Sequence, residues 1–93
     1  MPDDVFRFVL REFPPGEEDE ALSLLRSAVT HTGEPAGDRL LRCAAVASHG
    51  NLERLTRQVD QLKRDYRDVI VAGEYESRGG KLVRVRDLTQ PIP

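Results

Sequence analysis

Cysteine and long apolar runs are scarce or missing in this 93-residue chain, and each shortage excludes a class of protein. A single cysteine excludes an internal disulfide framework and a zinc site built from cysteines. No apolar run approaches the roughly 18 residues that a membrane-spanning helix needs. The first residues are acidic and lack the basic flank and small-residue cleavage site of a secretory signal. We therefore expect no secretory leader, and no membrane among the partners.

The composition is typical of one small folded domain. Apolar residues make up 39% of the chain and charged residues 32%, with a net charge of -2, so wholesale disorder is not expected. At this length folding buries only about 60–65% of the unfolded surface, and a deep catalytic cleft would remove core that the domain needs. We therefore expect the chain to act through its surface.

The charge is divided unevenly along the chain. Residues 1–38 carry nine acids and three arginines, a net charge of -6. Residues 39–93 carry eleven bases and seven acids, a net charge of +4, and the two values sum to -2. This asymmetry favours attraction between the two halves, or between copies of the chain.

Apolar spacing predicts three helices in the first half. A Pro-Pro-Gly sequence ends the first helix, four successive carboxylates open the second, and Asp38 can cap the third. The third helix is apolar nearly all round, which is typical of a buried helix. The three predicted helices cover residues 3–13, 17–32 and 39–49.

The most regular pattern predicts a long fourth helix from residue 52 to about residue 75. Six apolar residues follow one another in steps of three and four, which makes an uninterrupted heptad stripe. They are Leu52, Leu55, Val59, Leu62, Tyr66 and Val69. At 1.5 Å per residue this helix would be about 36 Å long and the third helix about 17 Å. The overhang then has to be covered by the first two helices or by a second chain.

Arg78-Gly79-Gly80 is expected to break this helix. The partial alternation of residues 81–88 predicts a short strand or an extended arm, with no obvious partner strand. The predicted fold is therefore all-α: a small four-helix bundle with a long fourth helix and a short extended C-terminal tail. In this division residues 1–78 form the helical bundle and residues 79–93 form the basic extended tail.

Two groups of residues are candidates for interaction. Tyr66 lies on the predicted stripe, so its ring is expected to be buried, with a partner for its hydroxyl group at the edge. It is flanked by Arg67 and Asp68, and the group forms either a recognition patch or, as we favour, a polar lock for the long helix. The basic tail can bind phosphates, but it has no aromatic side chain for stacking, so we favour docking on the acidic half or on a partner. The candidate interaction residues are Tyr66, Arg67, Asp68, Tyr75, Arg78, Lys81, Arg84 and Arg86.

No constellation of residues points to catalysis. Cys43 lies in the most apolar stretch and is expected to be a buried structural thiol rather than a nucleophile. His31 and His49 lie near predicted helix ends, where capping is favoured over metal binding. No phosphate loop, nucleophile elbow or metal motif is present. We expect no catalytic residue, no metal site and no cofactor, and a protein that is not an enzyme.

The second half of the chain also carries a set of short motifs. They are Arg42-Cys43-Ala44, His49-Gly50-Asn51-Leu52, Asp65-Tyr66-Arg67-Asp68-Val69-Ile70, Glu74-Tyr75 and Val85-Arg86-Asp87-Leu88. In this pattern the chain resembles, over residues 38–92, a family of small bacterial helical proteins of about this length. No activity is known for that family, so the resemblance implies a bacterial cytoplasmic protein and no particular chemistry.

These observations favour a non-enzymatic protein-interaction module. It would act through the long helix and the basic tail, on a protein partner or as a homodimer. The alternative is a nucleic-acid-binding protein that uses the arginine-rich tail.

Overall fold

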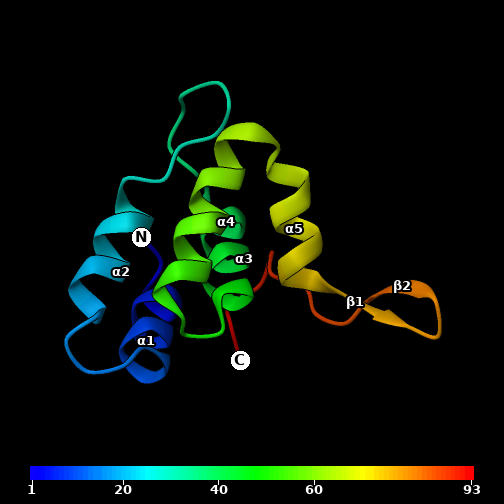
Figure 1. Cartoon of the computed structure of the whole chain (residues 1–93), viewed down its shortest axis with the longest axis horizontal. Coiled ribbons are helices and arrows are strands. Elements are labelled where there is room, and N and C mark those ends of the chain that lie inside the picture. Colours follow the sequence, from blue (N-terminus) through cyan, green and yellow to red (C-terminus); the bar gives the residue numbers. More distant parts are fainter.

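The computed structural model describes residues 1–93 as five helices followed by a two-stranded antiparallel sheet (Figure 1). The predicted helical body is confirmed at this level, but the predicted four-helix bundle is not. The elements are α1 (Asp3–Glu12), α2 (Glu18–Arg26), α3 (Asp38–Ser48), α4 (Leu52–Arg64), α5 (Tyr66–Glu74), β1 (Tyr75–Arg78) and β2 (Lys81–Arg84). None of the five helices is both long and apolar enough to cross a bilayer.

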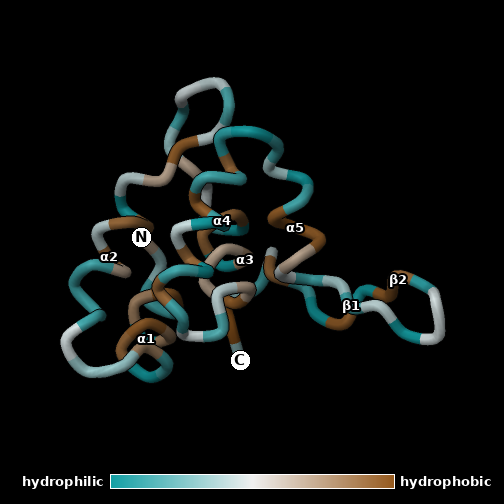
Figure 2. Tube along the Cα trace, in the orientation of Figure 1, coloured by the Kyte–Doolittle hydropathy of each residue, from teal (hydrophilic) through white to brown (hydrophobic).

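Helix α3 lies at the centre of the fold and packs against α1, α4 and α5. Its apolar residues explain this place, because Cys43, Ala44 and Ala45 are each fully buried. The same core cluster includes buried apolar residues of the other four helices, whose hydrophobic stretches are brown in Figure 2. The prediction that this helix is the buried one is therefore confirmed.

Helix α2 ends six residues earlier than predicted. After Arg26 the chain leaves the helix and forms a loop in which Val29 pairs with Pro35 in an isolated antiparallel bridge. The loop contains the β-branched residues Val29, Thr30 and Thr32, which favour extended backbone over helix.

The predicted long fourth helix is wrong, because the chain breaks it at Asp65. This residue has extended backbone (φ -156°, ψ 105°), and its carboxylate accepts a hydrogen bond of 3.0 Å from the Arg67 N–H, which caps α5. The chain then turns back, and α5 runs beside α4 (Figure 1). Leu55, Leu62 and Val69 are all fully buried, so both parts of the stripe face the core. The predicted overhang, which the first two helices or a second chain would have had to cover, therefore does not exist.

The expected lack of a partner strand for residues 81–88 is also wrong. Strand β2 pairs with β1, and the register places Arg78 opposite Lys81. The two residues between them, Gly79 (φ +57°) and Gly80 (φ +79°), form the tight turn. A two-residue hairpin turn with positive φ at both positions matches the twist of the strands and favours glycine at both.

The last nine residues return to the helical body and lie against it. Leu88 is almost completely buried in the core. The Ile92 N–H donates a hydrogen bond of 3.0 Å to Asp4 of α1, and Arg42 of α3 donates two more to the same carboxylate. The C-terminal segment therefore joins α1 to α3 and is not a free arm.

Candidate interaction site: the β-hairpin and its buried base

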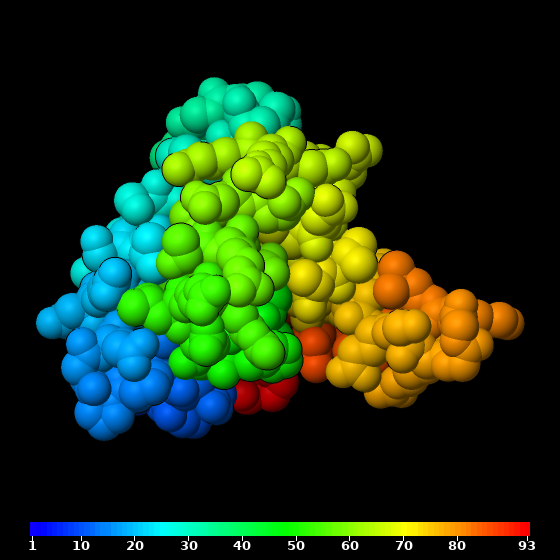
Figure 3. Space-filling view, in the orientation of Figure 1, coloured from blue at the N-terminus to red at the C-terminus, as the bar shows by residue number.

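The hairpin β1–β2 projects from the helical body and is the most exposed part of the fold (Figure 3). Leu82 is 59% exposed, the highest value among the large apolar side chains, and its neighbour Val83 is 37% exposed. The hairpin therefore has no core of its own on either face. A two-stranded hairpin of this kind is only marginally stable in water unless something else fixes it.

The two outer edges of the hairpin present unpaired backbone groups. In an antiparallel ladder, hydrogen-bonded pairs alternate with pairs whose N–H and C=O groups point outward. The Val85 N–H donates to the Glu74 carbonyl at 2.8 Å, which extends the ladder at its base. From this register Ser77 on β1 and Leu82 on β2 turn their backbone groups away from each other. Because the sheet has only two strands, both edges are open to a further strand.

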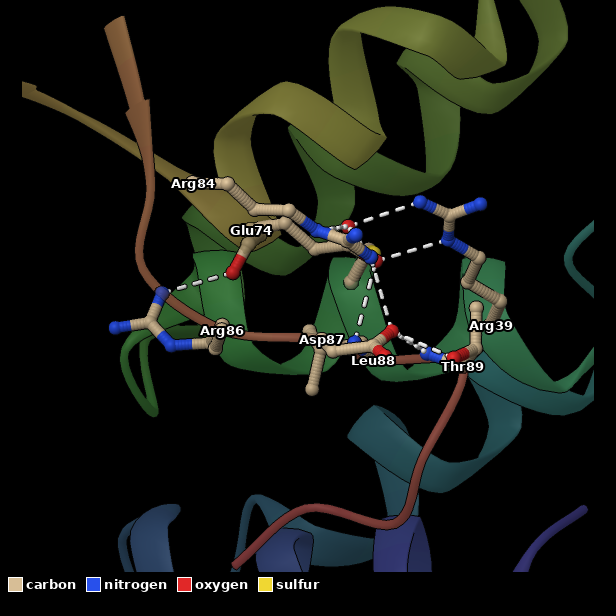
Figure 4. A network of polar contacts seen from close by, with 9 residues as sticks. Arg39, Glu74, Arg84, Arg86, Asp87, Leu88 and Thr89 are labelled. Atoms are coloured by element: carbon tan, nitrogen blue, oxygen red, sulfur yellow. Dashed lines mark hydrogen bonds and ion pairs between the residues drawn. The ribbon is translucent and has the colours of Figure 1, made fainter.

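The base of the hairpin is fixed by a buried carboxylate, Glu74, the last residue of α5 (Figure 4). Its side chain is fully buried. Arg39 of α3 donates two hydrogen bonds to it, at 2.8 and 2.9 Å, and Arg84 of β2 donates a third at 3.0 Å. The Leu88 N–H donates a fourth at 3.3 Å. A buried charge is tolerated only with partners of this kind, and here they join α3, α5, β2 and the C-terminal segment.

Two of the four cations in residues 78–86, Arg84 and Arg86, belong to this base. Arg84 also pairs with Asp87 at 2.9 Å, and Arg86 donates a hydrogen bond of 2.8 Å to the Gly73 carbonyl, near the C-terminal end of α5. Near the turn, Arg78 pairs with Glu76 of its own strand at 3.2 Å. Lys81 forms no ion pair, so the cationic character of the hairpin is concentrated at its tip.

The thiol of Cys43 lies 3.7 Å from Glu74 and donates to its carboxylate. Burial raises the pKa of Cys43 to about 12, and the charge of Glu74 adds to the effect. The thiol therefore stays protonated at neutral pH. This agrees with the predicted role of a buried structural residue and leaves no nucleophile at the site.

The carboxylate of Glu74 should make the stability of the fold depend on pH. The hydrogen bonds from Arg39 lower the pKa of Glu74 in the folded chain. Its contribution to the free energy of unfolding is complete above the pKa of the unfolded carboxyl, about 4.3, and is lost as the pH falls through the lower folded value. In urea titrations from neutral pH downward, we expect the difference in midpoint between the wild type and Glu74→Gln to shrink below about pH 4. A difference that stays constant with pH would contradict this assignment.

The other predicted group lies at the opposite end of α5, so the structure does not bring the eight candidate residues together. Tyr66 is 37% exposed, and its ring stacks on His31 with centroids 6.2 Å apart, so the predicted burial of this ring is wrong. Arg67 pairs with Asp65, and Asp68 accepts a hydrogen bond of 2.9 Å from Gln61 of α4. These contacts hold the junction between α4 and α5.

Sequence reasoning did not single out Arg39 or the burial of Glu74. Arg39 is 35 positions away in the chain, and no local spacing links the two residues. One signal was present in the sequence. Glu74 directly follows the apolar run from Val69 to Gly73, so the helical turn that contains Glu74 offers few other polar groups. A carboxylate in that position needs a cation from another element.

Comparison with known proteins adds no residue assignment. No protein-family model, no curated protein and no solved structure matches the chain. The structure brings together no group of three His, Cys, Asp or Glu side chains that could hold a metal ion. The candidate site therefore depends on the geometry of the hairpin alone.

Proposed function

We propose that the chain is a protein-binding module and that β2 accepts an extended segment of a partner protein as a third strand. One observation supports this proposal above all: the hairpin is fixed at its base by a buried ion-pair network, yet its strands bury almost nothing. A projection that is held in place but left uncovered is suited to docking. Strand addition supplies backbone hydrogen bonds, and exposed side chains supply specificity.

The charge on β2 indicates which kind of segment would bind. Its four residues include Lys81 and Arg84 and no acid, and Arg78 lies opposite Lys81. Two copies that paired through β2 would bring these like charges together, which disfavours self-association. We therefore commit to a partner segment in which apolar residues alternate with acidic ones, the apolar ones against Leu82 and the acidic ones towards the tip.

Nucleic-acid binding is the weaker candidate. Arg78, Arg84 and Arg86 already have partners within the chain, which leaves Lys81 as the one unpaired cation for phosphate contacts. One unpaired cation supplies little of the counterion release on which nucleic-acid affinity depends.

Leu82→Asp should weaken the binding of the partner segment without unfolding the chain. Random peptides displayed on phage would be selected against the intact protein, and their contacts mapped by amide chemical shifts. We expect the selected peptides to alternate apolar and acidic residues and to shift residues 75–84. Leu82→Asp should weaken their binding at least about tenfold, because it removes the apolar contact and adds a repulsive charge.

Leu10→Asp is the matched control, because Leu10 is a 51% exposed leucine on α1, outside the hairpin. It should leave peptide affinity unchanged. Selected peptides that shift other residues, or that bind Leu82→Asp as well as the wild type, would disprove the proposal. Light scattering tests whether a second copy of the chain, rather than a partner segment, pairs with β2. A dimer mass for the wild type and a monomer mass for Leu82→Asp would identify a second copy and overturn the choice of an acidic partner.

A further inference from the structure

A shallow cleft lies between α3, α4 and α5, apart from the hairpin strands, and its volume is about 340 Å³. Small side chains open it: Ala47 of α3 and Ala72 of α5 leave room where larger residues would fill the groove. Its lining residues are Ala47, His49, Arg54, Arg57, Gln58 and Ala72. The volume is at the lower end of the range of small-molecule sites, about 300–1,000 Å³.

The charge of this cleft is unusual for an acidic chain. None of its lining residues is a carboxylate, although the protein has 16 acids and 14 bases. Arg57 pairs with Glu53, one turn earlier on α4, at 2.6 Å. Arg54 forms no ion pair, and beyond the helix ladder only its backbone N–H is engaged, with the Asn51 side chain. The cleft therefore presents one guanidinium without a counterion, next to further donors from His49 and Gln58.

A second pocket differs from this cleft in having a carboxylate among its lining residues. That pocket has a volume of about 280 Å³ and lies at the junction of α4 and α5. It also contains two arginines, but Asp65 lines it too and pairs with Arg67 at 2.9 Å. In each pocket one arginine is paired and the other, Arg64 here and Arg54 in the α3–α4–α5 cleft, forms no ion pair. The difference is that Asp65 lines this pocket, whereas Glu53, the partner of Arg57, is not a lining residue of the α3–α4–α5 cleft.

We propose that the α3–α4–α5 cleft binds the phosphate group of a small phosphorylated organic molecule. Arginine presents several N–H donors in a planar fork that matches phosphate oxygens, so Arg54 is the main ligand, supported by Arg57 and His49. The organic part of the molecule lies against Ala47 and Ala72. The cleft uses no residue of β1 or β2, so this inference is independent of the proposed docking of a peptide.

His49 provides a variant that separates binding from folding. Its backbone has φ +51°, the left-handed conformation, at the C-terminal cap of α3. Glycine adopts this conformation without strain, so His49→Gly should raise the melting temperature of the chain. The same change removes a donor from the cleft and should weaken ligand binding. A fall in affinity together with a rise in stability cannot result from unfolding.

The test is a titration of the intact protein, at low ionic strength, with inorganic phosphate and with phenyl phosphate, followed by amide chemical shifts. We expect saturable shifts at residues 47–58 and 72, with tighter binding of phenyl phosphate. Arg54→Gln should weaken both ligands about tenfold, which corresponds to the loss of one charge-assisted hydrogen bond. Arg26→Gln, which replaces an exposed and unpaired arginine on α2, should leave both affinities unchanged.

Three results would overturn the proposal. The absence of saturable shifts with either ligand would remove the site. Equal weakening by Arg54→Gln and Arg26→Gln would reduce the effect to general electrostatic attraction. Equal affinity for inorganic phosphate and phenyl phosphate would overturn the proposal that the organic part of the ligand is bound, since Ala47 and Ala72 would then contribute nothing to the affinity.

Discussion

Gly73→Ala is expected to destabilise the fold strongly. A Cβ atom at this position would lie 2.6 Å from the Cys43 Cα and 2.7 Å from its Cβ. The first of these atoms is backbone, so no side-chain rotation can relieve the contact, and α3 and α5 would have to move apart. Overpacking in a core costs about 1–3 kcal/mol and more where the backbone must shift, so we expect a loss of about 3 kcal/mol or more.

Urea unfolding followed by circular dichroism would measure this loss as a lower midpoint. Gly79→Ala is the control, because an added methyl group there meets no atom within 4 Å and only the positive φ is penalised. That change should cost about 1 kcal/mol, and its effect should stay within the hairpin. Equal losses in the two variants would mean that the backbones of α3 and α5 do not approach as closely as described.

Glu74→Gln is expected to have the second largest effect. The substitution keeps the shape of the side chain but removes the charge that Arg39 and Arg84 share, and it turns an amide N–H₂ towards guanidinium donors. Breaking a buried ion pair costs about 3–5 kcal/mol. Because Arg39 and Arg84 are 39% and 43% exposed and can partly return to water, we expect a loss near the lower end, about 3 kcal/mol.

Glu76→Gln is the matched control. Glu76 lies two residues further on, and its pairs with Arg78 and Arg86 are on the surface. Surface pairs contribute about 1 kcal/mol or less, so this variant should unfold at nearly the wild-type urea concentration. Amide shifts give an independent measurement: Glu74→Gln should alter residues 81–88, whereas Glu76→Gln should alter only its neighbours. A loss for Glu74→Gln no larger than that for Glu76→Gln would remove Glu74 as the anchor of the hairpin.

The existence of the first three helices, the points at which they begin and the burial of Cys43 were predictable, because each depends on local signals. Apolar spacing marks the faces that enter the core, and Pro14 and Gly50 mark ends of elements. These signals are properties of single segments, and they do not require knowledge of which segments come together.

The break at Asp65 was missed because one long helix and two helices that fold back on a common core show the same apolar spacing. Local signals for the break do exist. Lys63 and Arg64 are typical of a last helical turn, and Asp65 followed by Asp68 is typical of a new N-terminus. The regular stripe outweighed them, although it was equally compatible with a stop at residue 64.

The network at the base of the hairpin could not be predicted, since its partners come from separate elements. The pairing of β1 with β2 could have been predicted, because two glycines between residues 75–78 and 81–84 are a known hairpin signal. What no local pattern indicates is that Arg39 and Leu88 converge on Glu74.

The hydrogen bond from the Ile92 N–H to Asp4 has a consequence for the order in which the chain folds during synthesis. It joins positions 88 residues apart, so almost the whole chain has to be enclosed in one loop before this bond can form. Contacts of such sequence separation form late, and this one cannot form until residue 92 has left the ribosome. Leu88, whose N–H completes the shell around Glu74, belongs to the same segment. The nascent chain can therefore build its helices early, but the hairpin acquires its fixed direction only once translation has passed the C-terminal segment.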